Sequence, residues 1–356
     1  MKKLRIALIG QGRSGRNIHG AYLRREENIY YDVAAVVDQD ESRRARALVE
    51  YPGCDVYADY KELFARDDID VVLNSTYSDQ HYSITKDLLM HKFNVLVEKP
   101  FAANSYECGD LIKTAKDNNV IVAVFQQSFY APFYTKMKEV LASGILGEVM
   151  QISIRYNGFT RRWDWQTLQS RLAGSVYNTG PHPIGFALDL LDFSDETKVA
   201  FSKLGCALTS GDAEDFAKII LVAPGKPLVD LEINSNDAFS DWNFRIQCSK
   251  GTYQTSINAY KMKYIPDGAN PERPVIFESL KNEKGDPVYC SEKLVTCEEE
   301  GTFAGTAFDV GTRMYYEMLY RTLTEGTPLE IKPEDIAKVI TVIETVHGQN
   351  PLPVKY

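Results

Sequence analysis

Short apolar runs alternate with helical segments through the first 124 residues, and this alternation constrains the fold more than any other feature of the chain. The runs are built mainly from valine, isoleucine, leucine and alanine. The predicted strands cover residues 4–9, 32–38, 70–74, 94–98 and 120–124. Apolar strands of this length, separated by helices, are typical of a parallel sheet with helices on both faces. We therefore expect residues 1–124 to form an α/β domain with a doubly wound parallel sheet.

The strands after residue 124 differ from these, because apolar and polar residues alternate along them. Three such segments are predicted at residues 152–156, 229–233 and 244–248. Half-polar strands favour a largely antiparallel sheet with helices on one face and solvent or another subunit on the other. Two further helices are predicted at residues 308–324 and 333–347. We expect residues 125–356 to form an α+β domain with a large, mostly antiparallel open sheet.

Composition and charge argue against several classes of protein. The formal net charge of -9 disfavours nucleic acid as a partner, because phosphate binding needs a basic surface. No stretch approaches the ~20 apolar residues that cross a bilayer, and residues 4–9 fit a buried strand better than a signal segment. The six cysteines form no C-x-x-C pair and have no histidine cluster beside them, so no metal is predicted. We expect a cytoplasmic protein without a membrane partner.

A glycine-rich segment, Gly10-Gln11-Gly12-Arg13-Ser14-Gly15, follows the first predicted strand and opens a helix. The acidic residue Asp38 ends the second strand, which is the context that a dinucleotide-binding fingerprint requires. In that context Gly10 permits a tight turn, Gly12 lets the backbone approach a pyrophosphate, and Gly15 lets the helix pack on its strand. The pyrophosphate then lies at a helix N-terminus, where free N–H groups and the helix dipole favour it. The sequence therefore predicts a site for a nicotinamide dinucleotide.

The same region indicates which dinucleotide is preferred. Asp38 is placed to accept hydrogen bonds from the adenine ribose and to repel a 2′-phosphate, which favours NAD. Arg43 and Arg44 keep NADP open, because either side chain could reach a 2′-phosphate, although we expect both to be solvated on their helix. The loop residues Arg13 and Ser14 are assigned to the cofactor site as well.

Glu98-Lys99-Pro100 at the end of the fourth predicted strand, together with the glycine fingerprint, resembles the Gfo/Idh/MocA family of NAD(P)-dependent sugar and cyclitol oxidoreductases. His81 before the preceding helix, the segment Gly-Ile-Leu-Gly-Glu-Val at residues 144–149 and the segment 174–182 also match. The similarity covers nearly the whole chain, and the joint order of these motifs is more specific than any one of them. The resemblance implies a Rossmann domain followed by an α/β domain with a large open sheet. It also implies homodimers or homotetramers joined through that sheet.

The resemblance further implies roles for individual residues. The lysine of the E-K-P motif, here Lys99, faces the nicotinamide and the substrate in the family. Thr76, His81 and Glu98 are assigned to the cofactor site with it. A later D-x-x-x-H segment of the family supplies acid–base chemistry, and its histidine corresponds to His182.

The residues themselves support a catalytic role for Lys99 and His182. Lys99 follows a parallel strand at its carboxyl end, where ligands bind in open α/β sheets, and an ammonium there can stabilise a developing alkoxide. His182 can take a hydroxyl proton, since its ordinary pKa lies near neutrality. The alternatives are a surface lysine paired with Glu98 and a histidine that only satisfies backbone groups.

Two positions depart from the family pattern. Asn178 stands where many members carry aspartate, and an amide can orient a hydroxyl or an imidazole but cannot accept a proton. A catalytic role for Asn178 and a plain helix-capping role are both open. Tyr77 replaces a proline that members often carry after the third predicted strand, which is a minor difference.

A segment with two of the three tryptophans of the chain, Arg161-Arg162-Trp163-Asp164-Trp165-Gln166, is the candidate substrate site. Indole faces pack against the C–H faces of sugars, and Arg162 can supply directional hydrogen bonds to hydroxyls. Tyr156 on the preceding strand is assigned to the same site. The alternative is a structural loop in which Trp165 is a hydrophobic plug.

The leading hypothesis is an NAD(H)-dependent oxidoreductase that acts on a secondary alcohol or ketone of a sugar, a cyclitol or a derivative. A second enzyme hypothesis keeps the cofactor bound and uses transient oxidation to cleave or epimerise a glycoside. A third hypothesis is a non-catalytic regulator that binds the dinucleotide, which the absence of aspartate at Asn178 leaves open.

Overall fold

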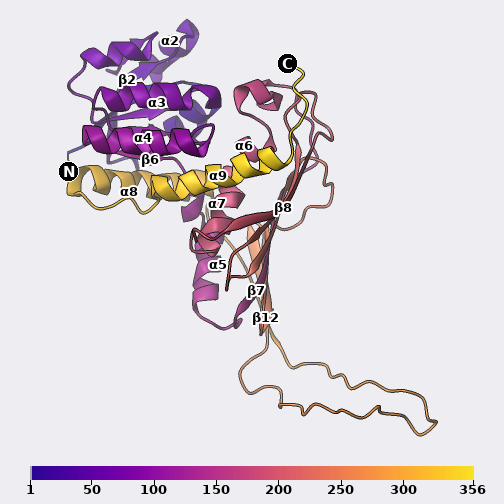
Figure 1. Ribbon diagram of the computed structural model, residues 1–356. Helices are drawn as coiled ribbons and strands as arrows, with labels where there is room; N and C mark the ends of the chain where they lie inside the picture. The colour runs from indigo at the N-terminus through magenta and orange to yellow at the C-terminus, as the bar shows by residue number, and fades with distance from the viewer. Residues whose placement is uncertain (1) are drawn as a thin grey trace.

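The computed structural model describes residues 2–356, and its N-terminal part is built on a six-stranded parallel sheet (Figure 1). The strand order is β3-β2-β1-β4-β5-β6, which is the order of a doubly wound Rossmann sheet. The strands are β1 (Leu4–Ile9), β2 (Tyr31–Val37), β3 (Asp55–Tyr57), β4 (Val71–Asn74), β5 (Val95–Val97) and β6 (Val122–Val124). The predicted fold class is confirmed, and each of the five predicted strands is present.

The helices between these strands cover the sheet, as the alternation of apolar runs and helical segments predicts. They are α1 (Gly20–Leu23), α2 (Glu41–Glu50), α3 (His81–Met90) and α4 (Ser105–Asn118). The side chain of Asn104 accepts a hydrogen bond from the Glu107 amide and caps α4. β3 was absent from the predicted strands, because it has only three residues, begins with an aspartate and lies at the sheet edge.

The sheet order determines where a ligand can bind. β1 pairs with β2 on one side and with β4 on the other, and the chain crosses from β3 back over β1 to β4. In open α/β sheets, ligands bind at the carboxyl ends of the strands at such a switch point. Gly10 follows β1, Asp38 follows β2, Thr76 lies just after β4, and Lys99 lies just after β5. The fold thus brings four residues that are far apart in sequence to one edge of the sheet.

The second sheet has eight strands in the order β14-β13-β12-β11-β7-β10-β9-β8, and only β7 and β10 pair in parallel. Its strands are β7 (Val149–Asn157), β8 (Lys198–Gly205), β9 (Phe216–Val222), β10 (Leu228–Asn234), β11 (Phe244–Cys248), β12 (Gly251–Thr255), β13 (Ala259–Tyr264) and β14 (Cys297–Thr302). Helices α5 (Pro132–Ala142) and α7 (Pro181–Leu190) pack on the apolar face. The predicted alternation is confirmed, since Ile152 and Ile154 are buried while Ser153 and Arg155 lie on the other face.

Two helices from the end of the chain pack on the first part of the molecule, and the second of them also packs on the eight-stranded sheet (Figure 1). The helix α8 (Thr312–Glu325), preceded by the π-helical turn η7 (Ala307–Gly311), returns to the first sheet, where the Tyr315 hydroxyl donates to the Val124 carbonyl at 2.6 Å. The helix α9 (Pro333–Gln349) packs on α4 of the first part and on β8 of the second. The predicted domain boundary after residue 124 stays a prediction. Within residues 2–356, no helix is long and apolar enough to span a membrane.

Candidate cofactor and active site

The backbone of the glycine loop leaves no room for a side chain at two of its three glycines. At the third glycine the space beside the backbone is empty. Gly10 has a φ of +88°, and a Cβ on it would lie 2.6 Å from the Ser75 carbonyl oxygen. A Cβ on Gly15 would lie 1.9 Å from the Gly10 carbonyl oxygen, so the helix packs directly on the turn. A Cβ on Gly12 would meet nothing within 4 Å. The loop therefore presents bare backbone to open space at Gly12, which fits the pyrophosphate of a dinucleotide.

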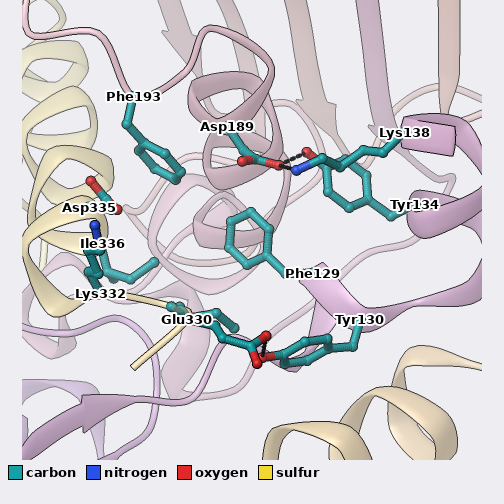
Figure 2. A pocket seen from close by; sticks show the side chains of 11 residues that line it. Phe129, Tyr130, Tyr134, Lys138, Asp189, Phe193, Glu330, Lys332, Asp335 and Ile336 are labelled. Atoms are coloured by element: carbon teal, nitrogen blue, oxygen red, sulfur yellow. Dashed lines mark hydrogen bonds and ion pairs between the residues drawn. The ribbon is translucent and has the colours of Figure 1, made fainter. Parts of the chain in front are cut away.

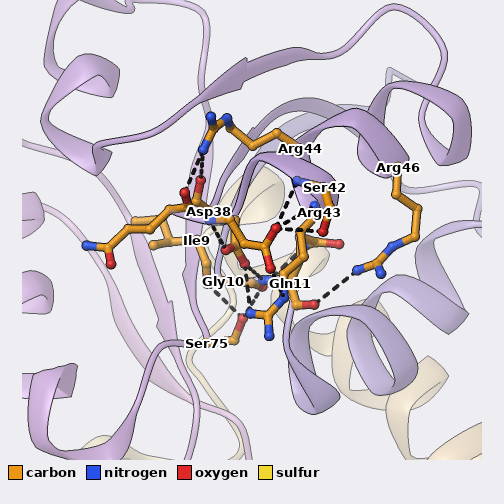
Figure 3. Close-up of polar contacts among 11 residues, drawn as sticks. Ile9, Gly10, Gln11, Asp38, Ser42, Arg43, Arg44, Arg46 and Ser75 are labelled. Atoms are coloured by element: carbon orange, nitrogen blue, oxygen red, sulfur yellow. Dashed lines mark hydrogen bonds and ion pairs between the residues drawn. The ribbon is translucent and has the colours of Figure 1, made fainter.

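Asp38 is fixed to the same loop (Figure 3). Its carboxylate accepts hydrogen bonds from the Gln11 amide at 2.7 Å and the Asp40 amide at 2.9 Å. The guanidinium of Arg43 lies 3.4 Å from that carboxylate, and Arg44 donates to the Asp38 carbonyl at 2.7 Å. Both arginines are partly exposed on their helix, and each also contacts an acceptor at the β2–α2 turn. Asp38 therefore carries a cationic neighbour at the place where a ribose would bind.

Lys99 reaches across the crevice to the second part of the molecule. Its ammonium donates to the Asn178 carbonyl oxygen at 2.7 Å, and burial lowers its pKa. The alternative in which Lys99 pairs with Glu98 at the surface is wrong, since Glu98 is 3% exposed and faces away from the Lys99 ammonium toward His19. Lys99 is half-buried, with its charged end at the boundary between the two sheets.

His182 stands beside Lys99 on the second residue of α7. Its Nδ1 lies 2.9 Å from the Ser128 hydroxyl, which leaves Nε2 for another partner. Burial, followed by repulsion from the Lys99 charge, lowers the pKa of His182 to about 3. The ring is therefore neutral at neutral pH, and a neutral imidazole has one nitrogen that accepts a hydrogen bond. Ser128 was missed from the sequence, although Gln126, Gln127 and Ser128 directly follow β6 at the ligand-binding edge.

Glu98 and His81 lie beneath the crevice rather than in it. Glu98 accepts from the Lys99 amide at 3.0 Å and pairs with His19 Nε2 at 3.0 Å. Burial alone would raise the pKa of Glu98, but the hydrogen bond and charge of His19 and the Lys99 charge hold it at about 2. His81 is 1% exposed and bonds the Pro100 carbonyl at 2.7 Å. Both side chains hold the loops that carry Lys99, and their contact with the cofactor stays a prediction.

Asn178 contributes its backbone to the site. It ends the short helix α6 (Ser175–Asn178), and its side-chain amide donates to the Gln166 carbonyl at 3.1 Å. The residue before α7 is Gly180, with no side-chain cap, so the helix-capping interpretation of Asn178 is wrong. Pro181 occupies the first position of α7, where its missing N–H costs no helix hydrogen bond. The carbonyl of Asn178, rather than its amide, meets Lys99 in this structure.

A buried carboxylate anchors α6 and was also missed from the sequence. Glu214 is 2% exposed, and it accepts from the Val176 amide at 2.9 Å and lies 3.3 Å from His347 Nε2 on α9. Gly174 has a φ of +105°, and a Cβ there would lie 2.5 Å from the Glu214 carboxylate. Glu214 thus fixes the start of the helix whose last carbonyl holds Lys99. The only signal in the sequence is the acidic run at residues 212–215 between two apolar strands.

The tryptophan segment joins the two parts of the molecule. The rings of Trp165 and Tyr77 meet edge to face with centroids 4.9 Å apart, and Arg171 forms an ion pair with Asp79 at 2.9 Å. If Trp165 is a hydrophobic plug, Tyr77 is the side chain on which it packs. Trp163 is 77% exposed.

The two remaining candidates for substrate binding differ in exposure. Arg162 is exposed and pairs with Asp164 at 3.0 Å. Tyr156 is half-buried, with its ring centroid 6.3 Å from that of Phe186, and burial raises its pKa. Substrate contacts by these two side chains and by both tryptophans stay predictions.

A separate cavity of about 190 Å³ lies between α5, α7 and α9 (Figure 2). Its lining includes Phe129, Tyr130 and Asp189 but none of the predicted site residues. The Asp189 carboxylate is already paired, with the Tyr134 hydroxyl at 2.5 Å and the Lys138 ammonium at 2.8 Å. The chemistry is therefore assigned to the crevice around Lys99 and not to this cavity.

The sheet order, the glycine loop and Asp38 define a Rossmann protein of the dinucleotide-binding class. Residues 4–126 match the family described as "Oxidoreductase family, NAD-binding Rossmann fold", and residues 134–254 match the "GFO/IDH/MocA C-terminal domain". The chain belongs to the Gfo/Idh/MocA family and is an NAD(P)-binding oxidoreductase. The resemblance predicted from the motifs is confirmed.

Individual relatives are distant. An uncharacterized oxidoreductase of Schizosaccharomyces pombe is 29% identical over 192 residues, which are 53% of this chain and 52% of that protein. Inositol 2-dehydrogenase 2 of Saccharopolyspora erythraea is 29% identical over 58% of this chain and 60% of that protein. The chain thus spans little more than half the length of these two relatives. The crystal structure of an NAD-binding protein from Listeria innocua has a TM-score of 0.79 at 20% identity, covering 98% of both chains.

Proposed function

We propose that this oxidoreductase transfers a hydride between a nicotinamide and a secondary alcohol or ketone of a sugar, a cyclitol or a derivative. The observation that carries the proposal is that Lys99, at the carboxyl edge of the Rossmann sheet, lies close enough to His182 on α7 for its charge to help lower the pKa of that histidine. The Asn178 carbonyl is the one hydrogen-bond partner of the Lys99 ammonium within residues 2–356. An ammonium has three donors, so two are free for a substrate oxygen. The name of the inositol dehydrogenase relative supports the substrate class.

The residues of the crevice divide the chemistry between them. When bound, the dinucleotide accepts or supplies the hydride. Lys99 donates to the substrate oxygen and stabilises the negative charge that develops there. His182 takes the hydroxyl proton at Nε2, because its Nδ1 is engaged by Ser128. The cofactor itself is assigned to the backbone at Gly12, to Arg13 and Ser14 in the same loop, and to Asp38 and Thr76.

A steady-state assay with NAD and a panel of polyols and cyclitols tests this function. We expect NADH to accumulate with at least one member of the panel. A product that is epimerised or cleaved without net NADH would favour the redox-neutral hypothesis. Dinucleotide binding with no turnover of any compound would favour the regulator.

We expect NAD to bind at least tenfold more tightly than NADP. Asp38 is 9% exposed and held in place by the Gln11 amide, so it cannot turn away from a 2′-phosphate. Calorimetric titration of both cofactors measures the ratio, and Asp38→Ser is expected to narrow it. Equal affinities in the unaltered protein would mean that Arg43 or Arg44 overrides the carboxylate, since both already lie at that turn.

We also propose that the protein forms a homodimer or homotetramer through the open face of the eight-stranded sheet. That face carries ordered ion pairs, such as Lys218 with Glu232 at 2.8 Å and Arg155 with Glu232 at 3.5 Å. The indole of Trp242 lies under the guanidinium groups of Arg155 and Arg245 on the same side. These contacts order the side chains of the face, and in a twofold dimer the same face of each subunit would meet its copy. Light scattering at micromolar concentration is expected to give at least twice the chain mass, and a monomeric mass would contradict the assignment.

A further inference from the structure

A long arm projects from the edge of the second sheet (Figure 1). It consists of residues 265–296, between β13 and β14, and contains no named helix or strand. Connections inside compact domains rarely exceed ~12–15 residues without a function or disorder. The arm is more than twice that length, so it requires an explanation.

The arm is organised as a hairpin. At its base, the Asn270 side chain donates to the Val295 carbonyl at 3.1 Å and accepts from the Val295 amide at 2.8 Å. Further out, Arg273 and Glu292 form an ion pair at 2.6 Å, and a turn at Asn282 closes the tip. Beyond Asp267, every hydrogen bond and ion pair found for the arm joins it to itself. The two legs are therefore held together, while the body of the same molecule gives them no support.

The arm exposes large apolar side chains that a solvated loop would not carry. Phe277 is 91% exposed, Tyr289 is 93% exposed and Val275 is 77% exposed. The other large apolar residues exposed on it are Ile276, Val288, Leu294 and Val295. Contiguous apolar surface of this kind on a folded protein marks a binding surface. Aromatic anchors such as Phe277 and Tyr289 are the residues that carry binding energy in interfaces.

We infer that the arm docks on a second copy of this chain, in a reciprocal exchange. It leaves the sheet from β13 and β14, the last two strands at one edge of the sheet whose open face is the proposed interface. Each leg has about 16 residues, which at ~3.3 Å per residue gives a reach of about 50 Å, enough to cross a neighbouring domain. In a twofold dimer both arms make the same contact, so each arm–body contact is made twice. The central strands of the open face carry polar side chains, and in the proposed dimer the arms add the apolar contacts of the interface.

Two variants test the arm against the rest of the interface. In the first, residues 272–293 are replaced by an Asn-Gly turn, which keeps the clamp between Asn270 and Val295 and the β13–β14 pair. In the second, Phe277→Ser and Tyr289→Ser are combined, so that the arm keeps its length. Tyr106→Ser on α4 is the matched control, because Tyr106 is an aromatic side chain that is 77% exposed outside the arm.

The measurement is sedimentation and light scattering over a dilution series from micromolar to nanomolar protein. We expect both arm variants to dissociate at concentrations at least ~10-fold higher than the unaltered protein, and Tyr106→Ser to behave like the unaltered protein. Unchanged dissociation of the arm variants would overturn the inference and leave the sheet interface standing. A monomeric unaltered protein would overturn both. NADH binding in the same samples should stay unchanged, which separates failure of the arm from failure of the proposed chemistry.

Discussion

Lys99→Met is expected to lower kcat at least ~100-fold, the usual scale for removing a donor that stabilises a developing oxyanion. The substitution keeps the length of the side chain and removes the charge, so the packing around it changes little. Affinity for NAD should stay nearly constant, because the glycine loop and Asp38 do not contact Lys99. Stopped-flow turnover and calorimetric binding separate the two effects. Lys116→Met is the matched control, since Lys116 is exposed on α4.

His182→Ala is expected to cause a loss of the same size, because it removes the proposed general base. The pKa of His182 near 3 also fixes the sign of the pH dependence in the unaltered enzyme. A base with a depressed pKa stays unprotonated as pH falls through 6.5, so the acidic limb of kcat/KM should lie well below that of an ordinary histidine. Full activity of Lys99→Met would contradict the catalytic roles of both Lys99 and His182.

The sequence predicts those parts of the fold that depend on local pattern. Continuous apolar runs identify the central strands of the first sheet, and the glycine spacing identifies the loop, because both follow from neighbouring residues. β3 has no such pattern. The contact between His19 and Tyr316 at 2.8 Å joins residues far apart in the chain, and no periodicity in either segment indicates it.

The same limit applies inside the candidate site. Lys99 and His182 are recognisable because their motifs are local. Glu214 supports the site only through α6, and its partner His347 lies on the last helix. The orientation of Asn178 depends on the Gln166 carbonyl, which the sequence places only in a loop. Candidate catalytic residues can thus be proposed from motifs, whereas the residues that position them are found only in the tertiary structure.

The glycine loop provides the second large effect, because two glycines differ in what surrounds them. In Gly15→Ala the new Cβ would lie 1.9 Å from the Gly10 carbonyl oxygen and 2.7 Å from the Ser75 hydroxyl. Backbone must move to relieve this overlap, at a cost of about 1–3 kcal/mol. We expect Tm to fall by about 2–8 °C and NAD affinity to fall at least ~100-fold, since the turn that binds the pyrophosphate opens.

Gly12→Ala is expected to lower the affinity for NAD without lowering Tm. Its Cβ meets no protein atom within 4 Å, and its backbone is outside the left-handed region, so Tm should stay within about 1 °C. The methyl group instead occupies the space proposed for the pyrophosphate, and NAD affinity should fall at least ~10-fold. Gly109→Ala is the control, because its Cβ also meets nothing within 4 Å but lies on α4, where alanine favours the helix. Differential scanning fluorimetry and calorimetric titration measure both quantities. If Gly12→Ala binds NAD as tightly as Gly109→Ala, the pyrophosphate does not lie against this loop.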